Sequence, residues 1–114
     1  MSSTVFKLTR TSGESMEALA KALNAKIGDE LAFRGIQRAG GAETLLLVFE
    51  KFYFRTSSMA VLTIQCVSDG YEQKATVIGT GGGSGILNIS WGANEDYAVI
   101  ASEILESLGF KPCE

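Results

Sequence analysis

The chain has 114 residues, of which 46% are hydrophobic and 20% charged, and ten basic against thirteen acidic residues leave a net charge of −3. This balance is typical of one globular domain that buries a core without disulfides or metals. Nucleic acid is excluded as a partner, because the chain lacks the basic surplus that neutralises phosphates. The sequence has no histidine, which excludes histidine-dependent catalysis and removes the commonest nitrogen ligand of zinc. No catalytic residue, metal site or cofactor is therefore predicted.

The N-terminal region is expected to form a strand over residues 4–10, followed by a helix. Thr11 and Glu14 have the spacing of a capping box, so the helix is predicted from there to about Lys26. Gly28 stands where a left-handed C-terminal cap would be, a conformation that glycine adopts without a Cβ clash. The apolar residues of this segment recur at the spacing of one helical face: Met16, Leu19, Ala20, Leu23 and Ile27.

The middle of the chain is predicted to contain four more strands joined by short turns. Asp69-Gly70 is a typical hairpin signal between two β-prone segments. The strands are expected at residues 31–37, 44–55, 59–67 and 71–78. Beyond them, residues 79–85 are expected to form a glycine-rich loop and residues 86–91 a short sixth strand.

The C-terminal region predicts a second helix, which Asn94 can cap and in which acidic residues occupy the first turn. Gly109 is expected to end it, with Phe110 folding back on the last turn and Pro112 preventing its resumption. Cys113 is expected on a frayed tail. The apolar stripe of the helix consists of Tyr97, Ile100, Ala101, Ile104, Leu105 and Leu108.

These elements predict a single α+β domain over residues 1–114, in the order β-α-β-β-β-β-β-α. Strands joined by short turns make an antiparallel meander, and each amphipathic helix needs a surface to cover its apolar face. The simplest arrangement is a two-layer sandwich, with a mostly antiparallel sheet of five to six strands and two helices on one face. This order of elements is similar to that of helix-grip ligand-binding domains, but the chain is shorter and no residue motif identifies a family.

The third and fourth predicted strands are apolar on both faces, which a sheet with one wet face does not require. Two helices cover only one face, so the other would expose a large apolar patch. Three explanations stay open: the sheet curls and encloses both faces, the open face self-associates, or it lines a pocket for an apolar small molecule. The interface residues predicted for the open face are Val48, Phe52, Phe54 and Val61.

The glycine-rich segment is the candidate ligand-binding element, because successive glycine amides can approach an anion closely. It lacks the lysine of a P-loop and the third glycine of a dinucleotide fingerprint, and a β-prone stretch follows it. A flexible or bulged connection between strands is therefore the favoured interpretation. If the segment closes over a pocket, the residues that would line it are Gly81, Gly82, Gly83 and Trp91.

The leading functional hypothesis is a non-enzymatic interaction module that self-associates through its sheet. The alternative is a protein that binds a small apolar ligand between the sheet and the glycine-rich loop, and an enzyme is third. No secretory signal or membrane-spanning run is present, and two cysteines fit a reducing compartment. The protein is accordingly expected in the cytoplasm as a homo-oligomer, with no membrane partner. Burial in a strand is expected to raise the pKa of Cys66 and make its thiol inert.

Overall fold

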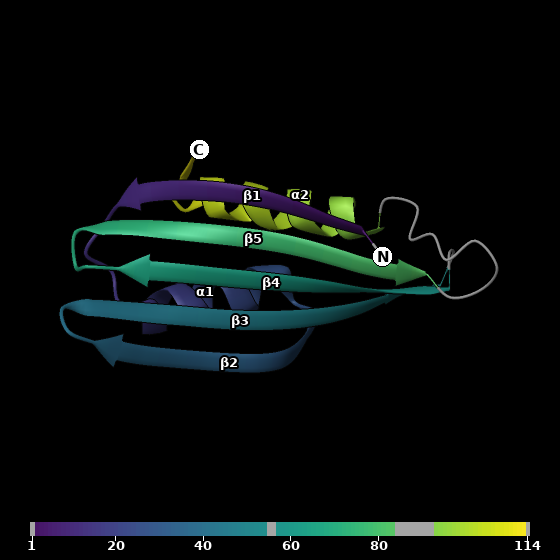
Figure 1. The fold of residues 1–114 in the computed structure, drawn as a ribbon, viewed down its shortest axis with the longest axis horizontal. Coiled ribbons are helices and arrows are strands. Elements are labelled where there is room, and N and C mark those ends of the chain that lie inside the picture. The colour runs from purple at the N-terminus through teal and green to yellow at the C-terminus, as the bar shows by residue number, and fades with distance from the viewer. Residues whose placement is uncertain (1, 55–56, 84–92, 114) are drawn as a thin grey trace.

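The structure of the chain is a computed structural model, which describes residues 2–54, 57–83 and 93–113 (Figure 1). Within these residues, six strands form one antiparallel sheet in the order β2-β3-β4-β5-β1-β6. In chain order the elements are β1 (Ser2–Thr11), α1 (Met16–Ile27), β2 (Glu30–Ala39), β3 (Ala42–Tyr53), β4 (Ser58–Ser68), β5 (Glu72–Gly83), α2 (Ala93–Ser107) and β6 (Lys111–Pro112). The predicted α+β class is confirmed, whereas the strand predicted over residues 86–91 lies outside the described residues.

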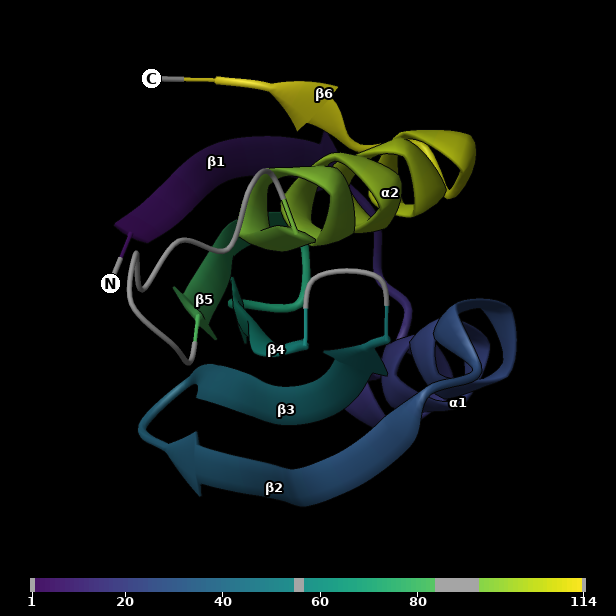
Figure 2. The same ribbon diagram turned by 90° about the vertical axis from the view of Figure 1, so that its right-hand side faces the viewer.

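Both helices lie on the same side of the sheet, which curls around them (Figure 2). Helix α2 packs against β1, β4 and β5, helix α1 packs against β2 and β3, and the two helices contact each other. The sheet therefore has a concave inner face covered by helices and a convex outer face, which is turned toward the viewer in Figure 1. Among the described residues, no helix is long and apolar enough to cross a membrane.

The inner face forms the core, because alternate side chains of each strand point to that side. Leu47 and Phe49 of β3 are fully buried there, opposite Ile64 and Leu62 of β4. Burial of each large apolar side chain contributes about 1.5–3 kcal/mol before entropy is subtracted. The helices complete this core with Met16, Leu19, Leu23, Tyr97, Ala101 and Leu105.

Helix α1 begins later than the capping-box pattern predicts. Strand β1 continues through Thr11, which pairs with Glu72 of β5, so Thr11 is not available as a cap. Ser15 caps the helix instead, because its hydroxyl accepts a hydrogen bond from the Ala18 amide at 3.1 Å. The predicted C-terminal cap is confirmed at Gly28, which adopts φ 72°.

Helix α2 ends as the sequence predicts, in a glycine cap. Gly109 has φ 102°, its amide donates to the Glu106 carbonyl, and the Phe110 amide donates to the Leu105 carbonyl at 3.1 Å. The Phe110 side chain folds back and is buried. The start of the helix differs, because it begins at Ala93 and so includes Asn94 within its first turn.

The tail beyond α2 is a sheet edge, so the expectation of a frayed tail was wrong. Lys111 and Pro112 form β6 beside β1, and the Cys113 amide donates to the Lys7 carbonyl at 2.8 Å. Proline has no N–H to donate to a further strand, which makes it suitable for an edge.

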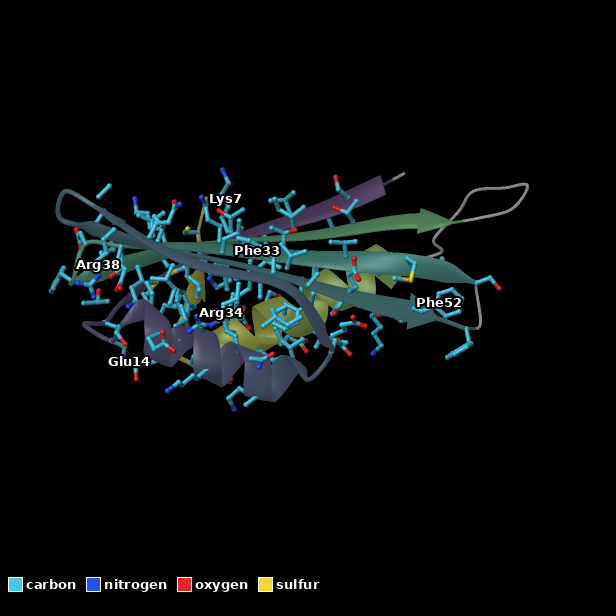
Figure 3. All side chains as sticks on the ribbon, turned by 90° about the horizontal axis from the view of Figure 1, so that it is seen from below. Lys7, Glu14, Phe33, Arg34, Arg38 and Phe52 are labelled. Carbon is cyan, nitrogen blue, oxygen red and sulfur yellow. The ribbon has the colours of Figure 1, made fainter. Side chains whose placement is uncertain are left out.

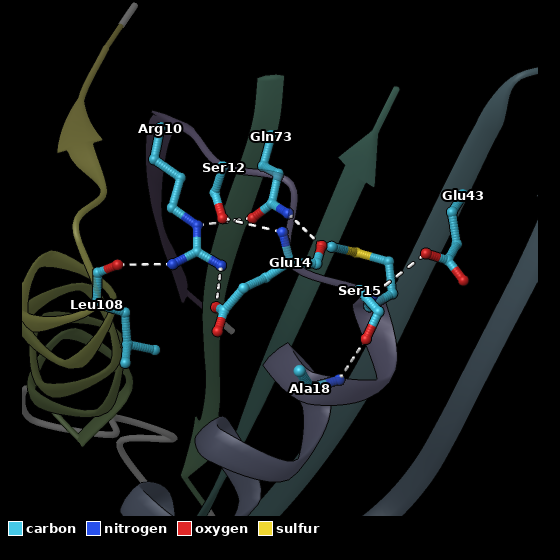
Figure 4. A network of polar contacts seen from close by, with 9 residues as sticks. Arg10, Ser12, Glu14, Ser15, Ala18, Glu43, Gln73 and Leu108 are labelled. Atoms are coloured by element: carbon cyan, nitrogen blue, oxygen red, sulfur yellow. Dashed lines mark hydrogen bonds and ion pairs between the residues drawn. The ribbon is translucent and has the colours of Figure 1, made fainter. Parts of the chain in front are cut away.

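One arginine connects β1, β5 and the end of α2 (Figure 4). Arg10 Nε donates to Gln73 Oε1 at 2.7 Å, and Nη1 donates to the Leu108 carbonyl at 2.6 Å. Nη2 pairs with Glu14 at 3.1 Å, and the guanidinium lies 4.6 Å from the Phe110 ring centroid. The Arg10 side chain is only 7% exposed, and its charge is favourable at a helix C-terminus. This arginine therefore has a structural role.

Candidate functional site

The outer face of the sheet carries large apolar side chains that no described element covers. On β2, β3 and β4 the exposed ones are Phe33 at 52%, Leu46 at 38%, Phe52 at 44%, Met59 at 42% and Val67 at 39%. Val48 and Val61 lie half-buried on the same face. We call these residues the outer patch: Phe33, Leu46, Val48, Phe52, Met59, Val61 and Val67.

The strand register brings the outer patch together. Phe33 lies opposite Val48, and Phe52 lies opposite Met59. The row that starts at Phe33 and Val48 continues across β4, β5 and β1 through Thr63, Ile78 and Val5. Val5 is 50% exposed, so the apolar surface extends beyond the outer patch toward the far edge of the sheet.

Phe33 reaches the outer face through a β-bulge. Leu31 pairs with Phe49 on the inner face, and a register shift between Leu31 and Phe33 turns Phe33 outward to pair with Val48. Its ring lies over Gly35, where a Cβ would come within 2.9 Å of the ring. A shallow hollow of about 250 Å³ lies beside the ring, lined by Phe33, Gly35, Ile36, Gln37, Thr44 and Leu46.

The four predicted interface residues lie at or beside the outer patch. Val48, Phe52 and Val61 belong to it, and Phe54 follows the last residue of β3 with 87% exposure. The Phe54 ring packs edge-on against Phe52, with centroids 5.0 Å apart. Whether a partner contacts these residues stays a prediction. Phe33 was not predicted, because nothing in the sequence places the bulge, although Gly35 leaves room for a ring on this strand.

The predicted glycine-rich loop was wrong for its first five residues. Gly79 to Gly83 continue β5, where Gly79 and Gly81 pair with both β1 and β4. Gly82 and Gly83 pair with Met59 and Ser58 of β4. These residues take part in a sheet ladder and do not form an anion-binding nest. Trp91 lies outside the described residues, so its grouping with Gly81, Gly82 and Gly83 stays a prediction.

The charged side chains that β1, β2 and β3 turn toward the helices are paired within the chain. Three ion pairs involve the segment around α1: Arg10 with Glu14, Arg34 with Glu17, and Arg38 with Glu43. Lys51 points inward from β3, and its Nζ lies 4.0 Å from Asp29. Glu50, the preceding residue of β3, points to the outer face. Figure 3 shows Arg34 on the helix side and Lys7 pointing away from the helices.

A polar hollow of about 310 Å³ lies at the turn end of the sheet, beside the start of α1. Its lining includes Ser15, Arg38, Glu43 and Asp69. Glu43 accepts a hydrogen bond from the Met16 amide at 3.2 Å and also pairs with Arg38. Because this carboxylate already occupies the positive end of the helix, the hollow offers no vacant anion site.

Two buried titratable groups lie in the core. Cys66 is buried in β4 as predicted, and burial raises the pKa of its thiol to about 11, the direction expected for a less reactive thiol. Burial, and after it the nearby Asp29 carboxylate, raises the pKa of Tyr97, whose hydroxyl has no hydrogen-bond partner among the described residues. Neither group lies in one of the two hollows described above. The described residues contain no group of three or more acidic or cysteine side chains that could hold a metal.

Comparisons with known proteins add a family but no activity. A sequence profile described as "Family of unknown function (DUF6054)" matches residues 1–109. No curated protein matches the chain.

The solved structures that share partial likeness with the chain include three of low sequence identity. The major latex-like protein 151 from Panax ginseng is 3% identical with a TM-score of 0.29, covering 93% of this chain and 97% of its own. Mll3558 from Rhizobium loti is 15% identical with a TM-score of 0.30, covering 93% and 96%. The ZhuI aromatase/cyclase from Streptomyces sp. R1128 is 12% identical with a TM-score of 0.28, covering 95% and 87%. At these TM-scores the likeness supports no inference about this chain.

Proposed function

Because the chain belongs to the DUF6054 family, whose function is unknown, we propose a function from the geometry of its surface. The protein is a non-enzymatic interaction module that self-associates through the outer face of its sheet. The observation that supports this proposal is the outer patch, in which Phe33, Phe52 and Met59 are each more than 40% exposed. Exposed apolar patches of this extent are typical of interaction sites in soluble proteins.

The size of the outer face suits a second copy of the chain. The exposed large side chains of the outer patch, with Val5 and Phe54, have exposed fractions of 38–87%. At roughly 170 Å² for each large apolar side chain, the low end of the aromatic range, they amount to roughly 600 Å². A stable interface buries about 800 Å² on each partner. The threonines and lysines that flank the patch supply the remaining area, and homodimers are the commonest oligomers.

The alternative of an apolar ligand under a glycine-rich loop loses its support, because Gly79 to Gly83 belong to β5. The hollow beside Phe33 is shallow and lies on the outer patch itself, so it is part of the proposed interface. Both cysteines are free, with Cys66 buried and Cys113 exposed, which agrees with the reducing cytoplasm that we propose as the location.

The proposal is tested by placing a charge in the centre of the outer patch. Val48→Asp and Val61→Asp are each expected to abolish self-association, because a buried unpaired carboxylate is strongly unfavourable in an interface. The matched control is Ala18→Asp on the exposed side of α1, where an acidic residue is favourable near the helix start. Light scattering after size-exclusion chromatography measures the mass.

The expected result is a mass above 12.1 kDa for the wild type and for Ala18→Asp, and a monomer for the other two variants. Circular dichroism confirms that each variant is folded. Folded Val48→Asp and Val61→Asp proteins that keep the wild-type mass would refute the proposed surface.

A further inference from the structure

The charges of the outer face lie in two opposite corners of the sheet. Glu30 of β2 and Glu50 of β3 are direct cross-strand partners, and both are on the outer face. Lys7 of β1 and Lys74 of β5 are diagonal neighbours at the other side, since Lys7 pairs with Thr76, two residues beyond Lys74. Glu72 and Lys111 lie near Lys7 and Lys74, and because their charges offset each other, the net charge of that corner stays positive.

Within the described part of the chain the side chains of these two corners form no ion pair, although Lys74, after the Glu72 and Tyr71 amides, helps to lower the pKa of the nearby Asp69 carboxyl. The charges that β1, β2 and β3 turn toward the helices are all paired. Among the described residues, the ion pairs use Arg10, Arg34, Arg38 and Lys51, and none involves Glu30, Glu50, Lys7 or Lys74. Two like charges directly opposite each other on neighbouring strands are destabilising. No described side chain forms an ion pair with Glu30 or Glu50, so a cationic partner would stabilise this pair.

We propose that a second copy of the chain supplies that partner, with each acidic corner, Glu30 and Glu50, seated on the basic corner, Lys7 and Lys74, of the other copy. This inference rests on the proposed function and adds the orientation of the dimer. From the strand spacing and the rise per residue, the two corners lie about 20 Å apart, on either side of Thr63 in β4. In this dimer the outer faces of the two sheets lie against each other. A two-fold axis that runs between the sheets near Thr63 then places the acidic corner of each copy on the basic corner of the other.

That arrangement also matches the apolar surface. The same axis leaves Leu46 close to its own counterpart and places Phe33 over the region of the partner that holds Val67. The strands of the two sheets then cross at a steep angle, one of the two common ways in which sheets pack face to face. Charge and apolar surface therefore favour the same two-fold arrangement, and opposite-charge contacts of this kind set the register of an interface.

A charge-swap experiment tests the orientation. One variant carries Lys7→Glu and Lys74→Glu, and the other carries Glu30→Lys and Glu50→Lys. Each variant alone is expected to associate at least about tenfold more weakly than the wild type, because every contact between corners becomes repulsive. An equimolar mixture is expected to recover a 1:1 complex, since all contacts between the two variants are attractive. The control Lys21→Glu with Lys26→Glu on α1 makes the same change in net charge as the Lys7→Glu, Lys74→Glu variant and is expected to associate like the wild type.

Salt gives a second readout, because ion pairs at an interface are screened. Raising the salt concentration is expected to weaken wild-type association and to strengthen self-association of each charge-swap variant. If both variants associate like the wild type, or their mixture stays monomeric, the orientation is refuted. The proposed function fails separately, when the wild type is monomeric or Val48→Asp leaves its association unchanged.

Discussion

The same strands form both faces of this sheet, yet the faces differ in the burial of their apolar side chains and in the pairing of their charged ones. On the inner face, Leu47 and Phe49 are fully buried under the helices, and inward-pointing charges such as Arg10 and Arg34 have partners in the chain. On the outer face, Phe33 and Phe52 stay exposed. The inner face therefore forms the core of the monomer, whereas the outer face leaves apolar side chains exposed, which is where we propose that a second copy binds.

The curl of the sheet is the physical origin of this difference. Wrapping around α2 gives the inner face enough surface to enclose its apolar side chains (Figure 2). The same curl makes the outer face convex, so its side chains spread apart and cannot cover one another. The sheet does curl, but it buries only one face and leaves large side chains of the other exposed, so the explanation in which the curl encloses both faces is wrong.

The largest expected contrast is between matched truncations on the two faces of β3. Phe49→Ala is expected to lower the free energy of unfolding by about 3–5 kcal/mol, because it leaves a cavity in the core. Phe52→Ala is expected to change monomer stability by less than about 1 kcal/mol but to weaken self-association. Urea unfolding and light scattering measure the two effects. Equal losses of monomer stability would contradict the division between the faces.

Removing a charge is expected to have a smaller and again unequal effect. Arg10→Leu leaves the buried Gln73 oxygen and the Leu108 carbonyl without a donor, so a loss of about 2 kcal/mol is expected. Lys74→Ala on the outer face is expected to change monomer stability by less than about 0.5 kcal/mol. The free energies of unfolding of the two variants are compared by urea unfolding, at a protein concentration below that at which the protein associates. An Arg10→Leu variant as stable as the wild type would mean that the network in Figure 4 is not structural.

The buried Cys66 is expected to make the stability of the fold depend on pH, whereas Cys113 is exposed. Because burial raises the pKa of Cys66 from 9.0 to about 11, the unfolded chain loses that proton first as pH rises. The resulting stability is fully present below about pH 9 and is lost toward pH 11; Tyr97 acts in the same direction. Urea unfolding at several pH values is expected to show this decline, and Cys66→Ala is expected to reduce it.

At pH 8 a thiol reagent is expected to modify Cys113 alone, and rapid reaction of Cys66 in the folded protein would contradict its burial.

The smallest effect is expected at the hollow beside Phe33. In Gly35→Ala the added Cβ would meet the ring at 2.9 Å, so the ring must move away from the strand. The ring is the far end of a flexible side chain, and stability is expected to change by less than about 1 kcal/mol. Self-association is nevertheless expected to weaken, because the shape of the outer patch changes. NMR of the Phe33 ring protons detects the movement, and an unchanged spectrum would show that Gly35 does not position the ring.

Much of the fold was predictable from periodicity and capping residues. The alternation of Leu47 with Val48 and of Leu62 with Val61 separates the two faces correctly, since adjacent residues of a strand point to opposite sides. The cap at Gly109 was predictable because its left-handed backbone favours glycine. The candidate site was predictable only through the same alternation, which identifies an open face but not its occupant.

The remaining features depend on long-range pairing, which local pattern does not encode. Thr11 extends β1 because Glu72 is opposite it, and this pairing leaves Ser15 as the helix cap. Gly79 to Gly83 form a strand because β4 provides a ladder for them, although glycine disfavours strands. The bulge that turns Phe33 outward likewise depends on the register with β3.

The central claim is that the outer face is complete only when a second copy covers it. Sedimentation equilibrium of the wild-type protein over a wide range of concentrations tests it most directly. The account predicts a mass that rises from 12.1 kDa at high dilution to twice that value and then levels off. A mass that stays at the monomer value up to the highest concentration would contradict it.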